Sequence, residues 1–210
     1  MKMEKLLNLN DMEKDALKEI GNVGTGNAAT ALSKLLNKHI EIIIPETKFV
    51  PITKFAKEFG GAENVVVSTY LQLLGDLSGE TLFIFPVKSA EKIVDLMMGQ
   101  PIGTSKIIDE MSQSAFKEMS NIFTGAYLNS MADFLEIKIL PSVPHITTDM
   151  VQSIMDFILA KVSNHSDDVL SIKTSINIKD IEIEGFFIMI FDIASMNKVL
   201  GLLKKMYGLS

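Results

Sequence analysis

The chain has 210 residues, of which 47% are hydrophobic, and it carries a net charge of −6 at neutral pH. It contains no cysteine, which excludes disulfide bonds and thiol chemistry. No cluster of lysine and arginine stands out, which argues against nucleic acid or an anionic membrane as a partner. No apolar run approaches the length of a membrane span, and the first residues lack the apolar core of a signal peptide. We expect a soluble cytoplasmic protein with no membrane insertion.

In the first half of the chain, a long helical pattern is followed by strand patterns and a second helix. Apolar residues first recur at the spacing of a core-facing helix and then alternate as in half-buried strands, with glycine and proline between the segments. The expected elements are a helix over residues 10–37, a strand over 39–44, hairpin strands over 65–74 and 80–85, and a helix over 88–98.

The second half repeats this plan and adds one element. The repeated elements are a helix over residues 108–134, a strand over 137–140, hairpin strands over 169–178 and 181–191, and a closing helix over 194–207. The addition is a helix over residues 149–162, which Thr148 would cap and which has no counterpart of comparable length in the first half.

A stretch that begins at Asp15 recurs 99 residues later, at Ser114, and the same offset relates Pro45 to Pro144. Nine of 31 positions match between residues 15–45 and 114–144, whereas about two matches would be expected by chance. This is an internal duplication. We expect one domain, residues 1–210, built of two pseudo-symmetric halves at about 10–104 and 105–210.

Each copy of this stretch places three polar residues on one face of its helix. Positions i, i+4 and i+7 share a face, because an α-helix turns by about 100° per residue. The two polar stripes are Asp15, Glu19 and Asn22, and then Ser114, Glu118 and Asn121. For one copy alone, a solvated helix face would explain the pattern about equally well. The recurrence of Glu-x-x-Asn favours a function.

Three glycines follow the first stripe within the same helix, at Gly21, Gly24 and Gly26. Each costs roughly 1 kcal/mol of helix stability relative to alanine, so we expect another surface to approach closely there. Residues 24–29 also match G-x-G-x-x-A, a dinucleotide-binding fingerprint. That motif must open a helix after a strand, and these glycines fall in mid-helix, which argues against nucleotide binding.

Two other chemistries find little support in the sequence. The three histidines, His39, His145 and His165, are far apart and have no partner at metal-ligand spacing. Neither Ser33 nor Ser130 lies in the sequence context of a nucleophile elbow.

The repeated pattern Asp/Ser-x3-Glu-x2-Asn-x22-Pro resembles the signature of the CheC/CheX/FliY chemotaxis phosphatases, and both copies are complete. Two complete motifs are typical of CheC-type members, whereas CheX-type members carry one. The resemblance implies a layered α/β (α+β) fold with pseudo-two-fold symmetry, in which two long motif helices pack side by side on one face of a mainly antiparallel sheet. The order of the predicted elements leads to the same arrangement.

The resemblance implies that the protein hydrolyses the phospho-aspartate of phosphorylated CheY. Asn22 or Asn121 would enter the regulator's active site and orient the attacking water, since an amide both donates and accepts hydrogen bonds. Glu19 or Glu118 would pair with the regulator's lysine. The Mg²⁺ would belong to the regulator, so no cofactor or metal of this protein's own is expected.

We expect supporting roles for the other motif residues. Asp15 and Ser114 would make a lesser contact or cap a helix, and Pro45 and Pro144 would each fix the turn after a strand. The resemblance also implies CheD as a partner, contacted through the helix over residues 149–162 and in particular through Asp149. A favourable interaction of Asp149 with the helix dipole explains this residue equally well. The alternative to an enzyme is a non-catalytic module that binds CheY or CheD.

Overall fold

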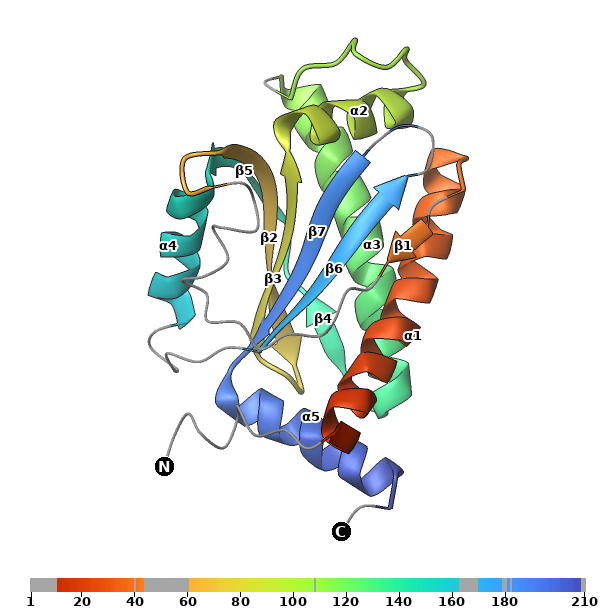
Figure 1. Ribbon diagram of the computed structural model, residues 1–210, viewed down its shortest axis with the longest axis vertical. Helices are drawn as coiled ribbons and strands as arrows, with labels where there is room; N and C mark the ends of the chain where they lie inside the picture. The colour runs from red at the N-terminus through yellow and green to blue at the C-terminus, as the bar shows by residue number, and fades with distance from the viewer. Residues whose placement is uncertain are drawn as a thin grey trace.

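In the computed structural model, residues 11–39, 41–43, 61–107, 109–162, 170–178, 181 and 183–208 are described. The elements in chain order are α1 (Asp11–Leu36), β1 (Glu41–Ile43), β2 (Val65–Gly75), β3 (Gly79–Pro86), α2 (Val87–Met98), α3 (Glu110–Leu135), β4 (Ile139–Pro141), β5 (His145–Met150), α4 (Val151–Val162), β6 (Leu170–Ile178), β7 (Ile183–Phe191) and α5 (Ile193–Met206) (Figure 1).

The strands form one seven-stranded sheet in the order β1-β6-β7-β3-β2-β4, and β5 also pairs with β2. All the pairings are antiparallel. When β1 is exchanged with β4, β2 with β6 and β3 with β7, the same order is read from the other edge of the sheet, as two-fold symmetry requires. The predicted antiparallel α/β fold is therefore confirmed, while the division into halves near residue 104 stays a prediction.

The two faces of the sheet carry different helices. On one face α1 and α3 lie side by side and run in opposite directions, while α4 covers part of the other face (Figure 1). Side chains alternate across the sheet. Val67 and Phe83 accordingly belong to the core beneath α1 and α3. Their strand neighbours Val66 and Leu82 pack with α4 in a second, smaller core.

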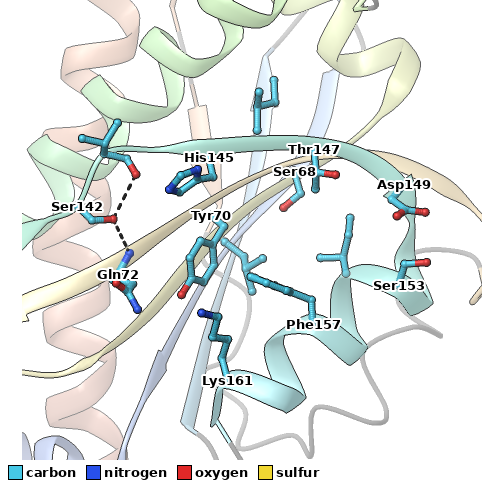
Figure 2. A pocket seen from close by; sticks show the side chains of 14 residues that line it. Ser68, Tyr70, Gln72, Ser142, His145, Thr147, Asp149, Ser153, Phe157 and Lys161 are labelled. Atoms are coloured by element: carbon cyan, nitrogen blue, oxygen red, sulfur yellow. Dashed lines mark hydrogen bonds between the residues drawn. The ribbon is translucent and has the colours of Figure 1, made fainter.

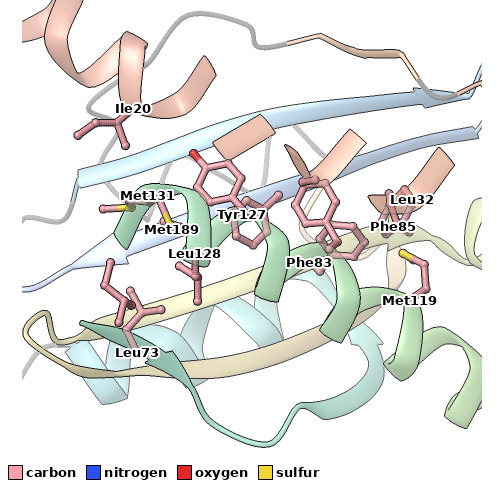
Figure 3. Packing of buried hydrophobic residues seen from close by; sticks show 14 of the residues in the cluster. Ile20, Leu32, Leu73, Phe83, Phe85, Met119, Tyr127, Leu128, Met131 and Met189 are labelled. Atoms are coloured by element: carbon pink, nitrogen blue, oxygen red, sulfur yellow. The ribbon is translucent and has the colours of Figure 1, made fainter. Parts of the chain in front are cut away.

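The contact between α1 and α3 is centred on Gly24 and Tyr127. Tyr127 is fully buried within the core (Figure 3). Its ring centroid lies 4.9 Å from that of Phe187 on the sheet. A Cβ atom added to Gly24 would come within 2.8 Å of the Tyr127 ring. The predicted close approach is therefore confirmed at Gly24. At Gly26 nothing in the described chain lies within 4 Å of an added Cβ, so a close approach there stays a prediction.

Asp95, at the end of α2, holds the link that leads into α3. Its buried carboxylate accepts hydrogen bonds from the backbone N–H groups of Gly103 (2.6 Å), Thr104 (3.2 Å) and Ser105 (2.6 Å). Burial acts to raise the pKa of Asp95, but the hydrogen bonds from Ser105, Gly103 and Thr104 outweigh it and lower the pKa. The carboxylate is therefore a fixed anion at neutral pH that holds residues 103–105, whereas α3 has its own cap in Asp109, whose side chain accepts from Ser112 N at 2.8 Å.

The start of the additional helix was predicted wrongly. Thr148 and Asp149 lie in β5, where Asp149 is paired with Val66 of β2, and α4 begins only at Val151. Backbone carbonyls satisfy the first N–H groups of α4, because Val151 N donates to Asn64 O at 2.9 Å and Gln152 N donates to Ala62 O at 3.0 Å. Thr148 is therefore not the cap, and Asp149 is not in the first turn.

The remaining predicted elements are found within a few residues of their expected bounds. The hairpin strands β2 and β3, the closing helix α5 and the helix α2 are all present, and α2 ends at Gly99, which has a φ of 65°. Residues 47–62 are described only from Gly61 onward, and Pro45 lies outside the described residues. No described helix is both long enough and apolar enough to cross a membrane.

Candidate functional site

Both polar stripes lie on the outer surface of the helix pair. Asp15, Glu19 and Asn22 on α1 are exposed, and so are Ser114, Glu118 and Asn121 on α3. The residues on the inner side of the same helical turns are buried and pack in the core against the sheet: Ala16, Leu17, Ile20, Phe116 and Met119. Each helix is thus fixed by its apolar face, which orients the polar stripe outward.

The two stripes point toward opposite ends of the helix pair. Within its own helix, each stripe lies N-terminal to the Gly24–Tyr127 contact. The helices α1 and α3 run in opposite directions (Figure 1). At a rise of about 1.5 Å per residue, Glu19 and Glu118 are separated by roughly 20 Å along the helix axes. The duplication therefore provides two separate surfaces rather than one combined site.

The glutamate and the asparagine of each stripe have no side-chain partners in the part of the chain that the structure describes. Among the described residues, Glu19, Asn22, Glu118 and Asn121 make no side-chain hydrogen bond or ion pair. Asn27, by contrast, is exposed on the same helix and donates to the carbonyl of Val23 at 3.4 Å. An exposed carboxylate and an exposed amide without internal partners are free to bond to another molecule.

A bare backbone lies beside each asparagine. Gly26 follows Asn22 by one helical turn, and Gly125 follows Asn121 at the same interval, so each glycine shares a face with its asparagine. Nothing lies within 4 Å of an added Cβ at either glycine. The surface next to each asparagine can therefore admit a closely fitting partner, a feature that the sequence analysis did not identify at Gly125.

The supporting residues are only partly described. Pro144 is half-buried in the short break between β4 and β5, and Pro45 lies outside the described residues. Nearby, Ser142 donates through its backbone N–H to Gln72 O and accepts through Oγ from Gln72 N, both at 2.9 Å. These bonds hold the break against β2 and do not involve Pro144. The predicted role of Pro144 in fixing the turn therefore stays a prediction.

Among the described residues, neither the glycine fingerprint nor the histidines mark a further site. Gly24 and Gly26 lie in the middle of α1, and no strand leads into a glycine-rich loop there. In the part of the chain that the structure describes, no group of three or more His, Asp or Glu side chains could hold a metal ion. His39 precedes β1 and His145 begins β5, two strands near opposite edges of the sheet, and His165 lies outside the described residues.

Comparison with known proteins identifies the family. The model of the CheC-like family matches residues 12–48, and that of the chemotaxis phosphatase CheX matches residues 67–156. The CheY-P phosphatase CheC of Bacillus subtilis (strain 168) is 34% identical over 170 residues, which cover 80% of this chain and 81% of that protein. The chain belongs to the CheC-like family.

Solved structures agree with this CheC-like fold. The crystal structure of Thermotoga maritima FliY has a TM-score of 0.78 at 24% identity, covering 94% of this chain and 98% of that one. CheX of Borrelia burgdorferi, solved in complex with CheY, BeF3 and Mg²⁺, has a TM-score of 0.52 at 13% identity, covering 81% and 95%. At these identities the likeness supports the fold alone.

Proposed function

We propose that the protein is a phosphatase that hydrolyses the phospho-aspartate of a phosphorylated CheY-type response regulator in the cytoplasm. Its relative in Bacillus subtilis is a CheY-P phosphatase, and a CheX structure contains CheY. The observation that carries the proposal is the pair of exposed Glu-x-x-Asn stripes, whose four side chains have no partners among the described residues.

In the proposed reaction, Asn22 or Asn121 enters the regulator's active site and holds a water in line with the acyl phosphate. The amide oxygen accepts from that water while the amide N–H₂ donates to the phosphoryl oxygens or to the water. The water oxygen bonds to phosphorus, the bond from phosphorus to the aspartyl oxygen breaks, and the products are inorganic phosphate and a free carboxylate. The asparagine contributes by position, which accounts for much of the catalysis in phosphoryl transfer.

Glu19 or Glu118 has the role of docking the helix on the regulator. A carboxylate three residues before the asparagine lies on the same face, so a contact to the regulator's lysine would align the asparagine with the phosphoryl group. The bare surface at Gly26 or Gly125 would let the regulator come close enough for this insertion. The Mg²⁺ and the lysine come from the regulator, and the protein needs no cofactor of its own.

The direct test of the activity uses a regulator labelled with ³²P on its aspartate. The account predicts that label is lost faster in the presence of this protein, in proportion to its concentration, and that the label appears as inorganic phosphate. A regulator that binds the protein but loses label at its intrinsic rate would favour the alternative, a non-catalytic module that binds CheY or CheD.

We also propose that Asp149 and the adjoining surface of α4 form a contact for CheD. Asp149 is exposed, and Met150 and Phe157 expose 45% and 48% of their surface nearby. Its Oδ1 accepts from Met150 N at 2.7 Å, so an Asp149→Ala change removes one local hydrogen bond and a surface charge.

Calorimetric titration with CheD tests this contact. Asp149→Ala is expected to weaken binding while leaving hydrolysis of phosphorylated regulator and the melting temperature nearly unchanged. Normal affinity for CheD in this variant would assign Asp149 a purely structural role.

A further inference from the structure

A pocket of about 670 Å³ lies on the face of the sheet opposite to the two motif helices, enclosed by α4, β2 and β5 (Figure 2). Its volume is in the range that holds a small organic ligand. The residues that line it come from both sides of the α4–sheet junction, and neither polar stripe contributes to it. The pocket is therefore separate from the surfaces proposed to dock on the regulator.

Ser68 supplies a buried polar group to this pocket. The residue is 1% exposed, and its hydroxyl has no hydrogen-bond partner among the described residues. Ser68 lies on β2 and lines the pocket between β5 and α4 (Figure 2). An unpaired buried hydroxyl lowers the stability of the fold, and a ligand that bonds to it would offset that loss.

Two aromatic rings form an apolar wall. Tyr70 and Phe157 make an edge-to-face contact with their centroids 5.3 Å apart, and Leu82 and Ile154 line the pocket beside them. Phe157 remains 48% exposed although it is on the pocket wall. Aromatic rings prefer edge-to-face or offset contacts with further rings, so an aromatic ligand suits this wall.

The charges in the pocket are separated along its length. Lys161 lies at the C-terminal end of α4, with its ammonium 5.6 Å from the centroid of the Phe157 ring. Asp149 lies before the other end of the helix (Figure 2). Burial, together with the nearby Glu80 carboxylate, raises the pKa of Tyr70, which stays a neutral phenol. The end of the pocket near Lys161 therefore suits an anion, and the aromatic wall lies next to it.

We propose that this pocket binds a small hydroxylated aromatic carboxylate. The ring packs against Tyr70 and Phe157, the carboxylate pairs with Lys161, and the ring hydroxyl bonds to Ser68 Oγ. Ser68 and Tyr70 are two residues apart on β2, about 7 Å along the strand and on the same face of the sheet, so a ring that packs against Tyr70 can place its hydroxyl toward Ser68.

Calorimetric titration with four probes tests the proposal. 4-Hydroxyphenylacetate is expected to bind saturably, and three analogues are each expected to bind about tenfold more weakly: phenylacetate lacks the hydroxyl, 4-hydroxyphenylacetamide lacks the charge, and tyramine reverses it. A tenfold loss corresponds to about 1.4 kcal/mol, close to the contribution of one hydrogen bond, including one to a charged group.

Two variants connect each probe to its residue. Lys161→Met should reduce affinity for 4-hydroxyphenylacetate about tenfold and leave affinity for the amide unchanged, whereas Lys205→Met, a change of an exposed lysine on α5, should alter neither. Ser68→Ala should lower affinity for 4-hydroxyphenylacetate to that for phenylacetate. It should also leave the melting temperature equal or raise it, because it removes an unpaired buried hydroxyl.

The proposal is overturned if none of the probes binds saturably at millimolar concentration, or if tyramine binds as tightly as the acid. It is also overturned if Lys161→Met weakens the acid and the amide equally, or if Ser68→Ala binds 4-hydroxyphenylacetate as wild type does. The thermal melts of both variants show that the titrations were made on folded protein.

Discussion

Gly24 and Gly26 are two residues apart in α1 but have different surroundings. The first is covered by the Tyr127 ring, and the second has open space around it. The sequence predicts a close approach only for the glycines as a group, because spacing alone does not say which of them faces the neighbouring helix. The exposed stripe residues could be predicted, because helical periodicity assigns a residue to a face.

Replacing each glycine by alanine should change stability in opposite directions. Gly24→Ala forces a Cβ against a fully buried ring, so we expect it to lower the free energy of unfolding by about 1–3 kcal/mol. Gly26→Ala should raise it by about 0.4–1 kcal/mol, because alanine restricts the unfolded chain and fits the open helical site. Urea denaturation measures both variants. Equal effects would contradict the assigned helix contact.

The docking role of the glutamates predicts a charge-reversal effect on substrate saturation. Glu19→Lys with Glu118→Lys should raise the concentration of phosphorylated regulator needed for half-maximal rate, because the new lysines repel the regulator's lysine. Glu63→Lys with Glu184→Lys is the matched control, since it makes the same change in net charge at exposed positions away from α1 and α3. Identical saturation curves for the two double variants would remove the glutamates from docking.

At the scale of elements, the long helices and the hairpins could be predicted, whereas β5 and the start of α4 could not. Periodicity and duplication identify an element that buries one face along its length. The strand β5 is short and mostly exposed, and carbonyl groups some 90 residues earlier, at Ala62 and Asn64, satisfy the first N–H groups of α4. A local pattern carries no information about such distant backbone partners.

The link between α2 and α3 depends on the charge of Asp95. Asp95→Asn replaces a carboxylate that accepts from three backbone N–H groups, so we expect a loss of about 1.5–3 kcal/mol at pH 7. The folded pKa lies below the ordinary value near 3.9, so this stabilisation is full above about pH 4 and is lost as the pH falls through the folded pKa.

Urea denaturation of the wild type and Asp95→Asn at pH 7 and at about pH 3 measures this dependence. The gap in the free energy of unfolding between the two proteins should shrink at the lower pH. Asp133→Asn, at an exposed position on α3, should show no such gap at either pH. A gap for Asp95→Asn that is the same at both pH values would contradict the charge-based account.

At the scale of the whole molecule, the strand order and the antiparallel helix pair give two similar surfaces that face opposite ends. The sequence predicted the two motifs because they recur at a fixed offset, but it did not reveal the pocket beneath α4. That pocket is formed by residues from β2, β5 and α4 that only the fold brings together.

Because the two stripes are separate, each should act independently. Asn22→Ala and Asn121→Ala as single changes should each leave part of the rate of phosphate release, and the two partial rates should add to about the wild-type rate. Steady-state release of phosphate by each single variant tests this. Complete loss of activity in either one would show that the halves do not act independently.

The most direct test of the proposed mechanism is the rate at which labelled regulator loses phosphate in the presence of Asn22→Ala with Asn121→Ala. The control is Asn27→Ala with Asn129→Ala, which removes two exposed asparagines from the same helices. The account predicts that the first variant melts as the wild type does and still binds the regulator, but leaves label loss at the regulator's intrinsic rate, while the control remains fully active. A first variant that accelerates label loss as the wild type does would contradict the account.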